Sequence, residues 1–168
     1  MGYKVFISLG SNMGLCSKNL QKAIAAISTL GGLKILSKSS IYHTEPQDML
    51  KQPWFINQVI SIDLEEQITP TILLKFLNDI ELNMGRLPGI PKGPRVIDLD
   101  ILTFENKVIS SQELTIPHPQ MKKRAFVLIP LQEISPDFVF FDGETIDEAL
   151  RKIQFRVEQN RIYQKMNT

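Results

Sequence analysis

Residues 96–104 read VIDLDILTF, an apolar run that directly follows a cluster of prolines and glycines at 85–94. The run is typical of a β-strand and the cluster of a loop. With the segments before it, this strand completes the order strand, helix, strand, strand, helix, strand. That order predicts an α+β fold, a ferredoxin-like βαββαβ sandwich whose antiparallel sheet has both helices on one face and the active site on the other side.

The helix before this strand is predicted over 70–84. Thr69 can cap its first turn, and Pro70 suits the first helical position. An apolar stripe follows at helical spacing and ends at Gly85: Leu73, Phe76, Leu77, Ile80 and Met84. This stripe indicates a helix that packs one face against a sheet.

Four earlier segments supply the rest of the order. Alternating apolar residues predict a strand at 3–9, which residues 10–14 break. Helical spacing predicts a helix at 17–30, ended by Gly31-Gly32, and further strands are predicted at 33–42 and 55–64.

The chain after residue 104 is expected to decorate this core. The sequence suggests an edge strand at 107–109, a short apolar segment at 125–133 and a helix from about 144. The polar tail after Phe155 is interpreted as a helical extension.

A chain of 168 residues is long enough to bury one sizeable core but short for two domains, so we expect a single domain over 1–168.

Composition limits the class of protein. The chain is 43% hydrophobic and 22% charged, as soluble globular proteins are. A net charge of +1 gives no general electrostatic surface for nucleic acid or an anionic membrane, and no apolar run approaches the roughly 18 residues that span a bilayer. Cys16 has no disulfide partner, which favours a reducing compartment, so we expect a cytoplasmic protein. We also expect a monomer whose partners are small molecules.

Asp98 and Asp100 lie two residues apart within the 96–104 strand. Because side chains alternate between the two faces of a strand, both carboxylates point to the same side, with α-carbons about 6–7 Å apart. Hard cations such as Mg²⁺ prefer oxygen ligands, so the pair is consistent with a Mg²⁺–nucleotide site. A solvated strand face is the alternative.

Basic residues lie close to this pair in the sequence. Arg95 could neutralise phosphate charge or simply pair with Asp98 or Glu81. Downstream, His118 stands between two prolines and is followed by the basic run at 122–124. Both features are also common on protein surfaces, so both interpretations stay open.

The usual nucleotide-binding motifs do not occur in the sequence, neither Gly-x-x-x-x-Gly-Lys-Ser/Thr nor Gly-x-Gly-x-x-Gly. Gly10-Ser11-Asn12 is similar to part of a phosphate-binding loop. A plain strand-to-helix turn explains these three residues equally well.

Three strings occur in a fixed order: SLGSN at 8–12, GPRVIDLDI at 93–101 and PHPQMKKRAF at 117–126. Together they resemble the 6-hydroxymethyl-7,8-dihydropterin pyrophosphokinase family. The resemblance covers about residues 3–155 and leaves 156–168 as a C-terminal extension. It implies an ATP-dependent diphosphotransferase of folate biosynthesis, which transfers pyrophosphate from ATP to the pterin hydroxyl and releases AMP.

The resemblance also implies roles for individual residues. Asp98 and Asp100 would bind two Mg²⁺ ions that bridge ATP, and positioning and charge neutralisation would dominate catalysis. Arg86 would begin a mobile loop that closes over the site and would act in catalysis with Arg95. The implied ATP-binding residues are Glu81, Arg95, Thr115, His118 and Arg124.

For the pterin, the family stacks the ring on an aromatic side chain and binds its amide edge with an asparagine and backbone groups. The implied residues are Thr44, Phe55, Asn57 and Phe126. Aromatic stacking suits a flat bicyclic ring, and a buried amide can pair with its mixed donors and acceptors. Ordinary core packing is the alternative for the two phenylalanines.

The chain departs from the family mainly at 87–92. This loop has one basic residue and no aromatic ring, so weaker closure over ATP is expected. Asn78, Glu113 and Pro119 also differ from residues that other members carry.

Two alternative functions make different demands on the sequence. A non-catalytic pterin- or nucleotide-binding module on the same fold would bind ligand without releasing AMP. An RNA-binding module would need exposed aromatic residues in an Arg/Lys-Gly-aromatic motif and a basic face, and the sequence has neither.

Overall fold

The computed structural model of the chain describes residues 2–47, 49–87, 89 and 91–165. Its first part contains β1 (Tyr3–Ser11), α1 (Cys16–Ile27), β2 (Leu33–Lys38), β3 (Tyr42–Thr44), β4 (Phe55–Leu64), α2 (Pro70–Asn83) and β5 (Asp98–Phe104). The predicted order of strands and helices is confirmed, with the second strand divided into β2 and β3.

The sheet is built around β1 and β4, which pair antiparallel along their whole length. β5 pairs antiparallel with the other edge of β1, while β2 and β3 both pair antiparallel with β4. This is the predicted ferredoxin-like sandwich. One later pair, between β3 and β9 (Arg161–Gln164), is parallel.

The prediction of one continuous strand over 33–42 is wrong because the pairing shifts at its middle. The register against β4 changes between Ile35 and Ser37. Ser39 then bonds to Val59 through both its backbone N–H, at 2.9 Å, and its side-chain oxygen, at 3.0 Å. The side-chain bond takes the place of a ladder bond and ends β2.

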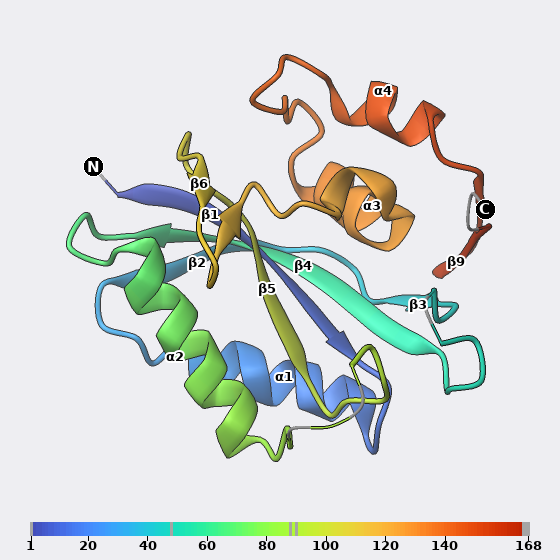
Figure 1. Cartoon of the computed structure of the whole chain (residues 1–168), viewed down its shortest axis with the longest axis horizontal. Coiled ribbons are helices and arrows are strands. Elements are labelled where there is room, and N and C mark those ends of the chain that lie inside the picture. The colour runs from blue at the N-terminus through green and yellow to red at the C-terminus, as the bar shows by residue number, and fades with distance from the viewer. Residues whose placement is uncertain (1, 48, 88, 90, 166–168) are drawn as a thin grey trace.

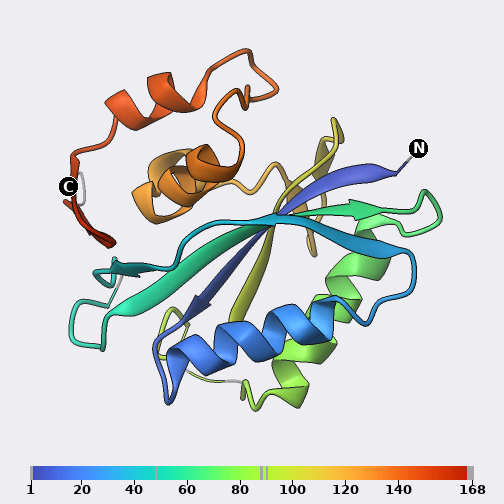
Figure 2. The same ribbon diagram turned by 180° about the vertical axis from the view of Figure 1, so that it is seen from behind.

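Helices cover both faces of the sheet, α1 and α2 on one side and α3 (Ala125–Ile134) and α4 (Ile146–Arg151) on the other (Figures 1 and 2). Alternation along β1 sends Val5, Ile7 and Leu9 into the core beneath α1 and α2. Phe6 belongs to the second core, beneath α3 and α4. Each fully buried Leu or Ile side chain in these layers stabilises the fold by about 1.5–3 kcal/mol.

Helix ends follow the expected chemistry where the sequence carries a capping residue. Thr69 accepts a hydrogen bond from the Ile72 N–H, and Pro70 occupies the first helical position of α2. The helix predicted from about residue 144 begins at Ile146, because Thr145 and Glu148 form a reciprocal capping box.

Within the described residues, no helix is both long enough and apolar enough to cross a membrane.

A small hairpin and a helical turn connect β5 to α3. β6 (Ile109–Ser110) pairs with β7 (Thr115–Ile116) in a separate two-stranded sheet, and η1 (Met121–Lys123) precedes α3. The strand predicted at 107–109 therefore begins two residues later and ends one residue later than predicted, and it does not extend the main sheet. The apolar segment predicted at 125–133 is a helix.

The C-terminal tail is a β-hairpin, so the prediction of a helical extension is wrong. β8 (Phe155–Glu158) pairs antiparallel with β9 (Arg161–Gln164), and Gln159 adopts a left-handed conformation, with φ 54°, in the turn between them. Ile162 is buried, which gives the hairpin an apolar anchor that the polar composition of the tail conceals. Residues 166–168 of the predicted extension lie outside the described residues.

Candidate active site

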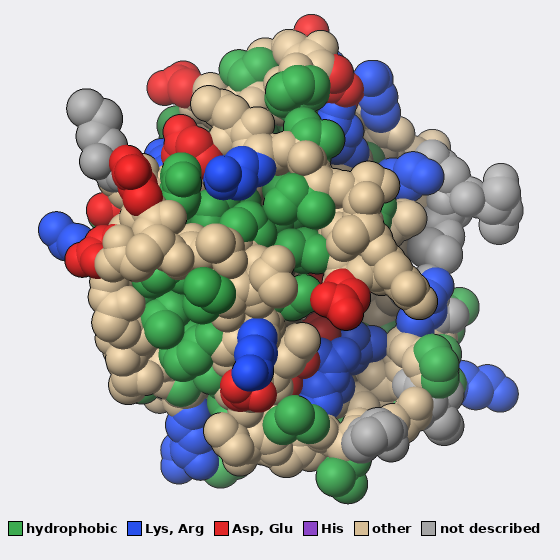
Figure 3. Space-filling model, turned by 60° about the vertical axis from the view of Figure 1, so that its left-hand side comes forward, with side chains coloured by type: hydrophobic (Ala, Val, Ile, Leu, Met, Phe, Trp, Pro, Cys, Tyr) green, Lys and Arg blue, Asp and Glu red, His purple; other side chains and the backbone are tan. Residues whose placement is uncertain are grey.

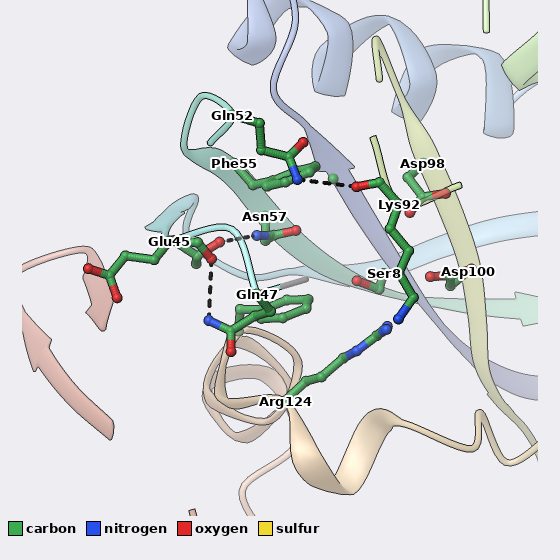
Figure 4. A pocket seen from close by; sticks show the side chains of 13 residues that line it. Ser8, Glu45, Gln47, Gln52, Phe55, Asn57, Lys92, Asp98, Asp100 and Arg124 are labelled. Atoms are coloured by element: carbon green, nitrogen blue, oxygen red, sulfur yellow. Dashed lines mark hydrogen bonds between the residues drawn. The ribbon is translucent and has the colours of Figure 1, made fainter. Parts of the chain in front are cut away.

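A pocket opens on the sheet face opposite α1 and α2, between the sheet, the loops at 45–52 and 92–96, and the start of α3 (Figure 4). The residues lining it that the sequence predicted as site residues are Thr44, Phe55, Asn57, Asp98, Asp100, Arg124 and Phe126. Segments distant in the sequence thus bring carboxylates, a cation, an amide and aromatic rings to one place.

On the face shown in Figure 3, basic and acidic side chains are interspersed, in keeping with the net charge of +1.

β5 presents Asp98 and Asp100 to this pocket and buries Leu99 in the core on its other face. The two oxygens of Asp98 accept from different arginines, Arg86 Nη1 at 2.8 Å and Arg95 Nη1 at 2.6 Å. Arg95 therefore does pair with Asp98, as one of the two interpretations predicted. Asp98 is the point at which the two predicted catalytic arginines meet.

Asp100 lies two residues further along β5 in the same pocket, and 39% of its side chain is exposed, against 23% for Asp98. Burial raises the pKa of Asp100 well above its ordinary range, and the charge of Asp98 raises it further. A further positive charge beside Asp100 would relieve this cost. Carboxylate oxygens arranged in this way suit a hard cation that keeps water or phosphate as its other ligands.

Glu81 on α2 supports the acid pair from the core side. Its buried carboxylate accepts the Leu99 N–H of β5 at 2.6 Å and pairs with Arg86. Burial raises the pKa of Glu81, while these two partners oppose the rise. Glu81 thereby fixes Arg86 against β5, so it acts on the pocket through Arg86.

His118 faces Asp100 across the pocket edge, with 3.9 Å between Nε2 and the Asp100 carboxylate. Its Nδ1 accepts the Gln120 N–H at 3.1 Å, so Nε2 carries the proton of the neutral ring. Burial, followed by the charge of Arg124, lowers the pKa of His118 to about 4. A neutral donor therefore points toward the carboxylates at physiological pH.

The other half of the pocket is aromatic and amide-lined. The Asn57 side chain is buried, and its Nδ2 donates to Thr44 Oγ1 at 2.6 Å (Figure 4). Arginines lie over both phenylalanine rings: Arg95 is 5.9 Å from the Phe55 centroid and Arg124 is 5.6 Å from the Phe126 centroid. Each ring therefore lines the pocket beside a cation. Phe126 also packs against the core beneath α3 and α4, so for this ring the core-packing interpretation holds as well.

Asn12 is a residue whose position the sequence did not explain. It exchanges hydrogen bonds with Arg95 in both directions: the Arg95 N–H reaches Asn12 Oδ1 at 2.8 Å, and the Asn12 N–H reaches the Arg95 carbonyl at 3.1 Å. Its Nδ2 donates to Gln52 Oε1 at 3.0 Å. The Gly10-Ser11-Asn12 string therefore ties two loops of the pocket together, beyond what a plain turn requires.

Gln47, Gln52 and Lys92 also line the pocket and were not predicted as site residues. They come from loops, where no periodic pattern identifies an inward-facing side chain. Gln52 Nε2 donates to the Lys92 carbonyl at 3.1 Å, which joins the two loops (Figure 4). The Lys92 and Arg124 side chains point toward each other in the pocket (Figure 4), an arrangement that suits an anion between them.

The structure does not bring every predicted site residue into this pocket. Thr115 is exposed on β7 and is not among the lining residues. Glu81, which is buried, and His118, which lies beside Asp100, do not line the pocket either. Arg86 and Arg95 line an adjoining groove formed with the 85–96 loop. Of that loop, Pro88 and Ile90 lie outside the described residues. Among the residues described, no three His, Cys, Asp or Glu side chains are grouped closely enough to hold a metal ion by themselves.

Residues 6–136 match the model of the 7,8-dihydro-6-hydroxymethylpterin-pyrophosphokinase (HPPK) family. A protein from Methylorubrum extorquens named 2-amino-4-hydroxy-6-hydroxymethyldihydropteridine pyrophosphokinase is 39% identical over 89% of this chain and 93% of its own length. The protein of the same name from Pseudomonas aeruginosa is 36% identical over 90% of this chain and 93% of its own.

Longer proteins also contain a similar region. The folic acid synthesis protein fol1 of Schizosaccharomyces pombe is 41% identical over 88% of this chain, which spans 20% of that protein. A solved HPPK-DHPS chain in complex with substrates has a TM-score of 0.68 at 15% identity, over 96% of this chain and 48% of that one. At that identity the likeness supports the fold alone.

Proposed function

This chain belongs to the 7,8-dihydro-6-hydroxymethylpterin-pyrophosphokinase family, and we propose that its pocket transfers pyrophosphate from ATP to 6-hydroxymethyl-7,8-dihydropterin. The activity is that of an ATP-dependent diphosphotransferase in folate biosynthesis. The oxygen of the pterin hydroxymethyl group attacks the β-phosphorus of ATP. The bond from that phosphorus to the oxygen shared with the α-phosphate breaks, AMP leaves with that oxygen, and the hydroxyl proton is released.

One observation carries this proposal: the acid pair and its arginines adjoin a slot built from an amide and two aromatic rings. The charged half suits a polyphosphate. The other half suits a flat, polar heterocycle, because rings can stack on it while a fixed amide pairs with its edge. Gly10 lies between the two halves, because it pairs with Asn57 on one side and with Asp98 on the other, so the reacting hydroxyl and the β-phosphate would come together beside it.

Asp98 and Asp100 would hold Mg²⁺, and two ions are expected. Two carboxylates fit this cation because Mg²⁺ usually keeps water and substrate phosphate as further ligands. The bound ion would neutralise charge that develops on the phosphate oxygens. Asp98 already positions Arg86 and Arg95, so both arginines stand ready to neutralise phosphate charge in catalysis.

Binding roles are assigned by the position of each residue. His118 and Arg124 would bind ATP from the α3 side, while Glu81 would act through Arg86. Thr115 would reach ATP only where the nucleotide extends beyond the pocket. On the pterin side, Phe55 and Phe126 would stack with the ring, and Asn57, oriented by Thr44, would bind its edge.

We also propose that residues 1–168 act as one unit, as a monomer in the cytoplasm. The pocket is supported from both ends of the chain, with Gly10 from β1 and the C-terminal hairpin paired to β3 beside it. Light scattering of the purified protein tests the monomer, because a dimer would double the mass of 19.1 kDa.

The function is tested by incubating the protein with Mg²⁺, ATP and the hydroxymethyl-dihydropterin and separating the nucleotides by chromatography. Pterin-dependent AMP is the expected product. ADP, or no nucleotide product, would refute pyrophosphoryl transfer. Pterin binding without AMP release would favour the non-catalytic binding module, for which the sparsely basic 87–92 loop is the argument.

A further inference from the structure

We propose that Gln164, at the end of β9, is a positioning residue that holds in place Arg124, assigned above to ATP, and Phe126, assigned above to the pterin. This inference rests on the function proposed above. It extends that function to the C-terminal hairpin, which lies beyond residues 6–136, the part of the chain that the family model matches.

The side-chain amide of Gln164 forms a two-point clamp around Arg124. Its Nε2 donates to the Lys123 carbonyl at 2.7 Å, and its Oε1 accepts from the Ala125 N–H at 2.8 Å. These backbone groups stand immediately before and after Arg124. A single planar amide therefore fixes the backbone of Arg124 from both sides.

The clamp is needed because α3 begins without a side-chain cap of its own. Arg124 occupies the N-cap position, and its side chain makes no capping hydrogen bond. The first N–H groups of a helix have no partner within the helix, and arginine cannot accept a hydrogen bond. Gln164 satisfies one of these groups from 39 residues further along the chain.

With its backbone held by Gln164, Arg124 points its guanidinium into the pocket (Figure 4). The guanidinium lies 5.6 Å from the centroid of the Phe126 ring, which lines the same pocket. The clamped backbone thus carries one cation and one ring toward the ligand. A capping residue at position 124 would leave the pocket without this cation.

The hairpin that carries Gln164 is itself attached to the opposite wall of the pocket. β9 pairs in parallel with β3, with Ile162 beside Thr44. Thr44 in turn accepts the hydrogen bond of the Asn57 amide. β9 therefore links the wall that holds the amide with the wall that holds Arg124 and Phe126.

Three further contacts keep β9 in register with this wall. Asn160 accepts the His43 N–H at 2.7 Å through its carbonyl and donates to the Ile41 carbonyl at 3.1 Å through Nδ2. The Tyr163 ring packs edge-on against Trp54, with 5.3 Å between centroids. A shift of β9 would break these contacts, so Gln164 has a fixed base from which to act.

The test compares Gln164→Leu with wild type in the full-length chain. Leucine removes both hydrogen bonds, which predicts roughly tenfold weaker pterin binding and a similar rise in the KM for pterin. Pterin affinity is measured by fluorescence titration, turnover by AMP release, and stability by thermal unfolding. A merely structural role would lower the melting temperature and leave the pterin affinity of the folded protein unchanged.

Asn160→Ala is the matched control, because it removes an amide–carbonyl bond of the same hairpin that does not touch residues 123–126. The backbone bond from His43 to the residue 160 carbonyl and the Tyr163–Trp54 contact remain and keep β9 in register, so Asn160→Ala should lower stability and preserve pterin affinity. Gln164→Glu keeps an acceptor for Ala125 but loses the donor to Lys123, so an intermediate loss of affinity is expected. It also provides a second folded variant.

Wild-type pterin affinity in Gln164→Leu, or an equal loss in Asn160→Ala, would overturn the clamp. The titration reads binding directly, so it tests the clamp independently of turnover. If wild type forms AMP and Gln164→Leu binds pterin normally, only the clamp fails. If wild type forms no AMP, the function proposed above fails, whatever the titration gives.

Discussion

Gly10 on β1 stands opposite Asn57 on β4, so close that a methyl group on residue 10 would lie 2.8 Å from Asn57 Oδ1. Real Cβ atoms essentially never approach another heavy atom so closely. The Asn57 amide has little room to retreat, because it is buried and donates to Thr44 at 2.6 Å. Position 10 must therefore be a glycine, because the Asn57 amide occupies the space where a Cβ atom would lie.

Gly10→Ala is predicted to displace the Asn57 amide and weaken pterin binding by about tenfold, the loss of roughly one buried hydrogen bond. ATP binding should change less, and calorimetry with each ligand measures both. Gly31→Ala is the control, because a methyl group there meets no atom within 4 Å.

Asn57→Ala is predicted to weaken pterin binding more than ATP binding. In that background the methyl group of Gly10→Ala has no amide to displace, so the second substitution should add little. Fully additive losses in the double variant would show that Gly10 acts on the pocket by some other route.

Asp100→Asn is predicted to reduce turnover at least about a hundredfold, because it removes one of the two carboxylates that would hold Mg²⁺. The metal-free protein should become more stable, since burial and the charge of Asp98 disfavour the Asp100 carboxylate. Asp98→Asn should instead lose stability, because Asp98 pairs with two arginines. AMP release and calorimetric unfolding measure both effects. Normal turnover in Asp100→Asn would remove it from the metal site.

His118 is predicted to stay neutral down to about pH 5, because its pKa is lowered to about 4. In the unfolded state the same imidazole has the ordinary histidine pKa of about 6.5. The stability associated with the neutral ring is therefore complete above pH 6.5 and is lost as the pH falls toward 4. His43→Gln leaves His118 as the single histidine, so its ring resonances can be followed by NMR. A midpoint near 6.5 would contradict the prediction.

Tyr42 is predicted to ionise later than an ordinary tyrosine. Burial and its 2.7 Å hydrogen bond to Glu133 raise the pKa of Tyr42 to about 12. The folded state therefore keeps the proton longer than the unfolded state, and the associated stability, complete below pH 10, is lost as the pH rises toward 12. Absorbance at 295 nm follows the titration. The late phase should disappear in Tyr42→Phe and move to lower pH in Glu133→Gln.

The central fold was predictable because its signals are local and periodic. The apolar stripe of α2 begins after the capping residue Thr69 and ends before Gly85, and the alternation in β1 and β5 marks the residues that face the core beneath α1 and α2. Such patterns depend on neighbours two to four residues away, so a single sequence contains them.

The C-terminal third was harder to predict, because its structure depends on distant partners. The hairpin at 155–164 is a pair of strands because β3 offers it an edge, and nothing in its own composition records that edge. Similarly, the division of the second strand depends on Ser39 meeting Val59, twenty residues away.

Within the candidate site, the strand residues were found and several loop residues were missed. Asp98, Asp100 and Asn57 lie on strands whose period fixes the direction of each side chain. Gln47, Gln52 and Lys92 lie on loops, which have no such rule. Thr115 was assigned by resemblance alone, and its role stays a prediction.

The hairpin that reaches across to α3 also ends the sheet. Beyond β8 no further strand is paired within the described residues. Exposed edge strands can recruit strands from other molecules, and short length and charged side chains discourage this. β8 has four residues, of which Arg156 and Glu158 form an ion pair at 3.0 Å. The same hairpin that braces the pocket thus protects this end of the molecule from edge-to-edge aggregation.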